Sequence, residues 1–262
     1  MSQFDTVLYE KNGDVVIITM NRPRRRNALN DVLQRELLAA FEQARDEANV
    51  RAIVLTGAGD GFCAGADLSG FQQLPTPDEV YDIIVSGYQP LISLITRIEL
   101  PVIAAVNGVA AGAGASLALA CDLRVMADNS SIMMAFSNVG LVPDAGATWL
   151  LERLVGYGRA YEIFIEAQKI PAERCLEWGI ANKIAPADGL MDIALAWALK
   201  LAKRPTLALG LTKHALDFAA RNDVAATVEY EARLQKQTIP SHDHMEGVTA
   251  FLQKRDPNFR GN

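Results

Sequence analysis

Three short segments rich in glycine and alanine are the part of the sequence best suited to chemistry. They cover residues 62–68, 108–114 and 142–146. A loop that leaves the carboxyl end of a strand and opens a helix directs unbonded N–H groups into a crevice, and small side chains let a ligand approach that backbone. One such loop equally suits packing of a helix against a sheet. Three in succession favour a ligand site, and the third also carries a carboxylate, Asp144.

The sequence lacks several motifs that are typical of other classes of enzyme. The segment that starts at Gly112 lacks the third glycine of a dinucleotide-binding fingerprint, and no Gly-Lys-Ser/Thr marks a P-loop. No Gly-x-Ser-x-Gly segment marks a serine hydrolase. The three cysteines are far apart, and His242 and His244 have no third ligand nearby. Neither a disulfide nor a metal site is therefore predicted.

Short apolar strands that alternate with helices must position these loops. We expect a hairpin with strands at 7–9 and 15–20, and further strands at 52–56, 100–106, 123–127 and 131–135. Helices are expected to begin at Asn30 and to cover 78–98, 147–154 and 159–166, with nearly continuous helix after 172. This order predicts βαβ crossovers and an α/β fold with a parallel-type sheet. Because no linker interrupts the chain, we predict one core, 1–195, and a C-terminal helical region, 196–262, that packs on a neighbouring subunit.

The composition fits a folded enzyme and argues against two other classes of protein. Hydrophobic residues make up 50% of the 262 residues, which is enough for a packed core. The formal net charge of −6 is unfavourable for general binding of nucleic acid. No run of about 18 apolar residues predicts a membrane span, and the first residues lack the basic and apolar parts of a signal peptide. We therefore expect a cytoplasmic protein without nucleic-acid or membrane partners.

Motifs along nearly the whole chain resemble the crotonase superfamily, also called the enoyl-CoA hydratase/isomerase superfamily. In chain order they are NRP at 21–23, NAL at 27–29, FCAGADL at 62–68, PVIAAVNG at 101–108, CDLR at 121–124, GLVP at 140–143 and KRDPNF at 254–259. The resemblance implies a crotonase-like fold, a spiral of ββα units with a C-terminal helical extension, and an acyl-CoA substrate. It implies no metal and no separate cofactor, because CoA arrives as part of the substrate.

By position, the resemblance gives Ala66 and Ala113 the central role of the family. Their main-chain N–H groups would hold the thioester oxygen while it carries the negative charge of an enolate. Such preorganised donors act without solvent reorganisation, and the loss of one typically costs ~3–4 kcal/mol of barrier. Because the donors belong to the main chain, an alanine at 113 serves where relatives have glycine.

Departures from the family pattern indicate which reaction follows. Hydratases of the family carry two glutamates that activate water, and those positions correspond to Ser116 and Phe136 here. The remaining carboxylate, Asp144, resembles the arrangement in the subgroup of 1,2-epoxyphenylacetyl-CoA isomerases and Δ3,Δ2-enoyl-CoA isomerases. We expect Asp144 to take a proton from one carbon and return it to another.

The surroundings of Asp144 are expected to adjust its pKa. Four apolar residues, Phe136, Leu141, Val142 and Trp149, predict a pKa raised by burial. Taken without the resemblance, the segment Pro-Asp-Ala-Gly is equally typical of a turn or a helix cap. An aromatic acyl group would need a wider apolar pocket, for which the helix over residues 81–94 is a candidate wall.

The resemblance also assigns residues to the CoA portion of the substrate. Arg24, Arg25 and Arg26, in one basic run with Arg22, are expected to bind phosphate through bidentate donors. A solvated loop is the alternative for some of these arginines. Along the first glycine-rich loop, the residues expected beside the ligand are Ala64, Asp67 and Leu68, with Asp67 interpreted as a helix cap and not as a base.

The C-terminal region is expected to complete the site of a neighbouring subunit. By resemblance, Phe251 would reach the adenine and Lys254 a phosphate of the neighbour's CoA, within a homotrimer or a dimer of trimers. Packing of Phe251 on its own helix fits the sequence equally.

Three alternative functions stay open. The chain could be a hydratase in which Asp144 and the backbone hold the water. It could be an acyl-CoA hydrolase or dehalogenase with Asp144 as the nucleophile. It could also be a non-catalytic binding member of the family, such as an RNA-binding relative, although the acidic balance argues against RNA.

Overall fold

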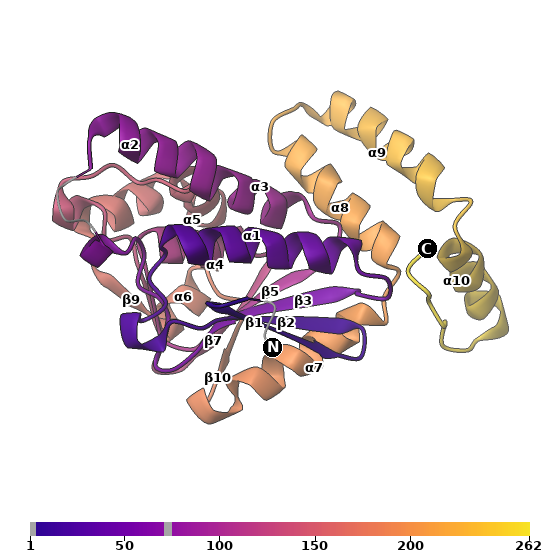
Figure 1. Ribbon diagram of the computed structural model, residues 1–262. Coiled ribbons are helices and arrows are strands. Elements are labelled where there is room, and N and C mark those ends of the chain that lie inside the picture. The colour runs from indigo at the N-terminus through magenta and orange to yellow at the C-terminus, as the bar shows by residue number, and fades with distance from the viewer. Residues whose placement is uncertain (1–3, 71–74) are drawn as a thin grey trace.

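The computed structural model describes residues 4–70 and 75–262, which form two β-sheets with helices around them (Figure 1). The larger sheet has six strands in the order β1-β2-β3-β5-β7-β10. Their bounds are Val7–Asn12, Val15–Met20, Ala52–Gly57, Val102–Val106, Leu123–Ala127 and Lys183–Ala185. Only the edge pair β1–β2 is antiparallel, and the other neighbours are parallel. The predicted hairpin and parallel sheet are therefore confirmed.

Both faces of the larger sheet are covered, which explains why its inner strands are apolar without alternation. All residues of β3 and β5 are buried. Helix α7, Leu190–Ala202, packs on one face through Leu190 and the alanines that follow at four-residue spacing. Helix α1, Asp31–Asp46, begins at the predicted cap, where the Asn30 side chain accepts the N–H of Leu33, and lies on the other face (Figure 1).

A second, smaller sheet was not predicted as such, although the strand expected at 131–135 is confirmed as one of its strands. Its four strands lie in the order β4-β6-β8-β9, over Gly61–Cys63, Val109–Ala111, Ser131–Met133 and Lys169–Pro171. Each strand has three residues, too few to show a period of two in the sequence. β4 and β6 are parallel neighbours, so the loops that follow them leave the same edge of the sheet.

One predicted helix differs from the structure, and one predicted pair of helices agrees with it. The helix expected over 78–98 consists of α2, Pro77–Asp82, a π-helical segment η3, Ile83–Tyr88, and α3, Gln89–Arg97. The two helices expected at 147–154 and 159–166 are confirmed as the two parts of α5, Ala147–Glu166, which is broken between them at Gly156 by φ +73° and ψ +164°. Glycine adopts this conformation without the steric cost that a side chain would bring. Helices α4, Ala113–Ala120, and α6, Ala172–Glu177, complete the core.

The C-terminal helices α8, α9 and α10 project to one side of the core (Figure 1). They cover Thr206–Ala219, Val224–Thr238 and His242–Gln253. The boundary expected between 195 and 196 falls inside α7, which belongs with the core because its buried side covers the sheet.

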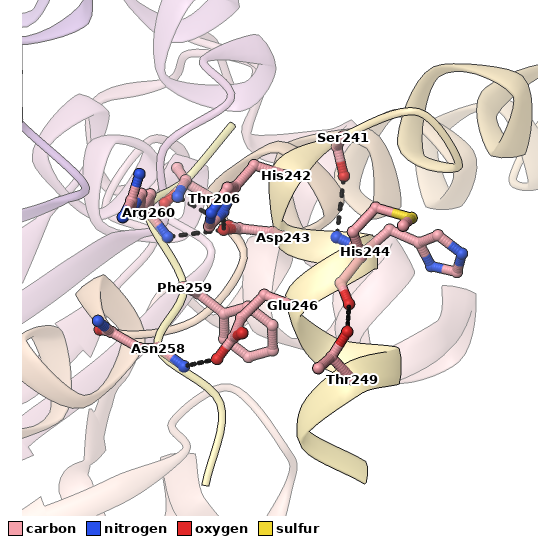
Figure 2. Close-up of polar contacts among 12 residues, drawn as sticks. Thr206, Ser241, His242, Asp243, His244, Glu246, Thr249, Asn258, Phe259 and Arg260 are labelled. Carbon is pink, nitrogen blue, oxygen red and sulfur yellow. Dashed lines mark hydrogen bonds and ion pairs between the residues drawn. The ribbon is translucent and has the colours of Figure 1, made fainter. Parts of the chain in front are cut away.

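The last residues of the chain fasten α10 (Figure 2). The carboxylate of Asp243, only 3% exposed, accepts the main-chain N–H of Arg260 at 2.6 Å and of Gly261 at 2.7 Å. Arg51, next to β3, donates to the carbonyl of Phe259 at 2.9 Å and to the hydroxyl of Thr206 at 3.0 Å. The tail thus joins α10 to the core and to the start of α8.

Candidate active site

The first glycine-rich loop is held so that the Ala66 amide is left unbonded. Leu29 forms an isolated parallel bridge with Ala66: its N–H donates to the carbonyl of Gly65 at 2.7 Å, and its carbonyl accepts the N–H of Asp67 at 2.9 Å. In such a bridge the central residue directs its own N–H away from the partner strand. Among the described residues, no acceptor bonds the Ala66 N–H.

The second glycine-rich loop opens helix α4 directly beside the first. Gly65 has φ +92°, and a Cβ atom placed on it would lie 2.8 Å from the carbonyl oxygen of Ala111 and 3.6 Å from the nitrogen of Ala113. The loop that carries Ala66 therefore passes close to the start of α4. This approach requires glycine at position 65, for reasons of both space and φ.

Helix α4 presents its first-turn amides at this junction. Gly112 precedes the helix with φ +50° and ψ −127°, and the N–H of Ala113 bonds to no acceptor in the part of the chain that the structure describes. Gly114 lies against Cys63, because a Cβ atom there would be 2.3 Å from the Cys63 carbonyl oxygen. A helix N-terminus of this kind favours negative charge.

The opposite end of α4 is capped by a buried cation. Arg124 donates to the carbonyls of Cys121 at 2.6 Å, Leu119 at 3.3 Å and Ile180. A positive charge at a helix C-terminus complements the helix dipole. Arg124 therefore stabilises the helix whose other end carries the Ala113 amide.

Asp144 lies in the turn before α5. Its Oδ1 atom is buried and has no hydrogen-bond partner among the described residues. Desolvation by burial raises the pKa of Asp144 from 3.8 to about 6. A carboxyl group with this pKa exchanges protons near neutral pH, as a general base requires.

Ser116 connects Asp144 to the donor helix. Its hydroxyl donates at 3.3 Å to the carbonyl oxygen of Asp144 and also lies 3.3 Å from that of Gly112. Ser116 is one helical turn after Ala113, or about 5 Å along the axis. The Ala66 loop, the Ala113 amide and the Asp144 turn are thus brought together.

The apolar surroundings expected for Asp144 are only partly present. Phe136 is buried, but Leu141, Val142 and Trp149 are exposed, with Val142 at 82%. The expected apolar surroundings are thus shown as buried only for Phe136. Two residues that follow Asp144 in the chain, Ala145 and Ala147, are buried.

Asp67 is held by hydrogen bonds from Ser69 and by an ion pair with Arg22. The Asp67 carboxylate accepts the Ser69 hydroxyl at 2.6 Å and its N–H at 3.1 Å, and it pairs with Arg22 at 2.7 Å. The hydrogen bond from Ser69, followed by that from Arg22, lowers the pKa of Asp67. Asp67 is thus the structural cap that the sequence indicated. Arg22 is committed to this pair, an interaction that the sequence did not indicate.

The other residues expected near CoA lie on the surface. Arg24, Arg25 and Arg26 are exposed around the short 3₁₀ helix η1, Pro23–Arg25, and Ala64 and Leu68 are exposed on the first loop. Asn27 holds η1 to this loop, because its buried amide donates to the carbonyls of Ala58 at 3.0 Å and Gly61 at 2.8 Å.

Phe251 and Lys254 lie at the end of α10, away from α4 in the same chain (Figure 1). Phe251 is 82% exposed, so it does not pack on its own helix. Within the described ranges, no three His, Cys, Asp or Glu residues are grouped as metal ligands. None of the helices in those ranges has the length and apolar character needed to cross a bilayer.

Comparison with known proteins identifies the class to which this fold and site correspond. Residues 10–262 match the enoyl-CoA hydratase/isomerase family, so the chain belongs to that family and has the crotonase fold. It is 41% identical to the 1,2-epoxyphenylacetyl-CoA isomerase of Escherichia coli (strain K12) over 97% of this chain and 98% of that protein. It is 42% identical to a probable enoyl-CoA hydratase of Rhodobacter capsulatus, over 98% and 99%.

Solved structures give the same result. The enoyl-CoA hydratase of Bacillus anthracis superposes with a TM-score of 0.93 at 33% identity, covering 98% of this chain and all of that one. The chain is therefore an enzyme of this family. The names of its relatives include both an isomerase and hydratases, so they do not decide which reaction it catalyses.

Proposed function

We propose that the protein is an acyl-CoA isomerase in which Asp144 moves a proton and the amides of Ala66 and Ala113 stabilise the enolate. The observation that carries this proposal is the buried Oδ1 of Asp144, which has no hydrogen-bond partner among the described residues. The main-chain carbonyl of the same residue accepts a hydrogen bond from Ser116, three residues after Ala113 in α4. Ser116 and Phe136 occupy the positions at which hydratases of the family have glutamate. Asp144 is then a single carboxylate that can carry a proton, whereas hydratases of the family activate water with a pair of carboxylates.

The proposed reaction moves one proton and leaves the composition of the substrate unchanged. The Asp144 carboxylate removes a proton from C2 of the acyl chain, next to the thioester carbonyl. The electron pair shifts into the carbonyl, and the thioester oxygen accepts hydrogen bonds from Ala66 and Ala113. When the double bond forms between C2 and C3, Asp144 returns the proton to C4. Two aligned donors are worth ~3–4 kcal/mol each in such reactions.

Two finer substrate assignments are compatible with this chemistry. A Δ3-enoyl-CoA would undergo the double-bond shift. A 2-(1,2-epoxy-1,2-dihydrophenyl)acetyl-CoA would undergo isomerisation of its epoxide, as the name of the Escherichia coli relative suggests. Hydration of an enoyl-CoA is the second candidate function, because a relative with 42% identity is named a probable hydratase.

The CoA portion and the assembly belong to the same proposal. Arg24, Arg25 and Arg26 are exposed beside the loop that carries Ala66, where phosphates would approach. In a homotrimer, or a dimer of trimers, Phe251 and Lys254 of one subunit would reach the CoA of its neighbour. The exposure of Phe251 supports this arrangement, because a large apolar side chain gains stability when a partner covers it.

Hydrogen exchange at the acyl chain tests the proposal. With 3-hexenoyl-CoA in D2O, NMR should show deuterium entering C2 and C4 with the wild-type protein. Asp144→Asn should abolish this exchange while binding of CoA persists. Unchanged exchange in Asp144→Asn would refute the role of Asp144. Formation of 3-hydroxyacyl product from crotonyl-CoA by the wild-type protein would instead favour hydration.

A further inference from the structure

Tyr88 is a buried phenol that the proposed reaction does not yet use. It is the last residue of the π-helical segment η3, and its side chain is 4% exposed. No hydrogen bond of its hydroxyl is found among the described residues, and its oxygen is not one of the fully buried atoms that lack a partner there. Such π-helical turns occur frequently at functional sites.

The packing around Tyr88 directs this side of the helix toward the Asp144 turn. Gly87 lies against α1, where a Cβ atom would be 2.2 Å from Oε1 of Gln34. Ile92, one turn beyond Tyr88, lies beside Gly146. A Cβ atom placed on Gly146 would be 3.5 Å from Cγ2 of Ile92. Residues four apart share a helix face. Tyr88 and Ile92 therefore face the turn that contains Asp144 and Gly146.

The charge of the Asp144 carboxyl group acts on the Tyr88 phenol. Burial raises the pKa of Tyr88, and the negative charge of Asp144 raises it further. The pKa of Asp144, in contrast, is raised by burial alone. Tyr88 thus keeps its proton at neutral pH, and its hydroxyl is available to an acceptor that is not Asp144.

We propose that the Tyr88 hydroxyl donates a hydrogen bond to an oxygen substituent on the acyl chain, and that the natural substrates are oxygenated acyl thioesters. This inference rests on the proposed function, because the thioester oxygen is assigned there to the amides of Ala66 and Ala113. The acceptor for Tyr88 is therefore a second oxygen. An epoxide across C3 and C4 has this chemistry: removal of the C2 proton forms the C2–C3 double bond, breaks the C3–O bond and leaves the oxygen on C4. The oxygen then takes a proton, so the product is an isomer of the substrate.

Two substrates of equal chain length test the role of Tyr88. We would measure kcat/KM for 3,4-epoxyhexanoyl-CoA and 3-hexenoyl-CoA with the wild type and with Tyr88→Phe. We expect a roughly 10- to 100-fold loss for the epoxide, as for other hydrogen bonds to a developing charge, and less than a threefold change for the alkene. Tyr157→Phe, at an exposed tyrosine of α5, should change neither value. Thermal unfolding of Tyr88→Phe checks that the fold is retained.

The possible failures are distinguishable. Equal losses for both substrates, or no loss for the epoxide, would overturn the inference about Tyr88 and leave the proposed isomerase intact. If the wild type converts neither compound and exchanges no C2 proton, the proposed function fails, and the inference fails with it.

Discussion

The hydroxyl of Ser116 donates a hydrogen bond of 3.3 Å to the main-chain carbonyl of Asp144. Ser116 belongs to α4, the helix whose first amide is that of Ala113, whereas Asp144 belongs to the turn before α5. This contact thus links the turn that carries the proposed proton carrier to the helix that carries one of the proposed oxyanion donors. Rates of reactions that depend on such alignment are sensitive to displacements of about 1 Å.

Ser116→Ala should therefore reduce catalysis more than stability. The Asp144 carbonyl also accepts the N–H of Ala147 at 2.9 Å, so it keeps a partner in the variant. We expect a loss of at most about 1 kcal/mol in the free energy of unfolding. The rate of C2 exchange should fall roughly tenfold because the Asp144 turn is no longer tied to α4. An unchanged exchange rate would show that Ser116 has only a packing role.

Gly65→Ala should damage the oxyanion site specifically. The new methyl group would meet the Ala111 carbonyl at 2.8 Å, on a backbone with φ +92°. Displacement of one donor predicts a fall in kcat of roughly 10²–10³-fold. Gly13→Ala is the matched control, because Gly13 also has a positive φ but has open space around the position of a Cβ atom. If both variants lose activity equally, the loss at 65 reflects general strain.

The pKa of Asp144 predicts the pH dependence of the reaction. Since the carboxylate is the reactive form, the exchange rate should rise with pH and reach half its maximum near pH 6. A midpoint near 4 would indicate an ordinary exposed carboxyl group. Titration of wild-type exchange between pH 4 and 8 gives this value.

The same pKa has a consequence for stability. Because burial raises the pKa in the folded state, the stabilising contribution is complete below the unfolded value of 3.8 and is lost as the pH rises through about 6. Asp144→Asn should therefore be more stable than the wild type at pH 7, by on the order of 1 kcal/mol after allowance for solvent screening. The difference should vanish near pH 4. Urea unfolding at the two pH values measures it.

Asp243→Ala should release the C-terminal tail. Its carboxylate accepts two main-chain N–H groups, those of Arg260 and Gly261 (Figure 2). Loss of these bonds predicts a decrease of about 1–3 kcal/mol in stability and faster hydrogen exchange at residues 258–262. Asp256→Ala, at an exposed position of the same tail, is the control. Unchanged exchange at 258–262 would mean that the tail is held by other contacts, such as those of Arg51.

The larger features of the fold could be predicted from local patterns in the sequence. The strand at 123–127 was predicted with its observed bounds, and the Asn30 cap was predicted at its observed position. These signals are local, because a run of apolar residues or a capping side chain acts within a few positions. Of the small sheet only the strand at 131–135 was predicted, since its three-residue strands gain stability only from pairing across the chain.

The candidate site divides in a similar way. Asp144 and the two donor loops were found through their residue types and the family resemblance, and their roles remain predictions. The contacts between them could not be found, because the Ser116–Asp144 and Arg22–Asp67 contacts join residues 28 and 45 positions apart. Tyr88 was hidden for another reason. The π-helical segment interrupts the helix expected over 78–98, so a regular period counted from the start of that helix does not place this side chain.

A crystal structure with butyryl-CoA, which has no double bond to move, tests the central claim most directly. We predict that the thioester oxygen lies 2.7–3.1 Å from the amide nitrogens of both Ala66 and Ala113, as in other oxyanion sites, with the Asp144 carboxyl group beside C2. A thioester oxygen bonded to other groups, or an acyl chain that does not reach Asp144, would contradict the account.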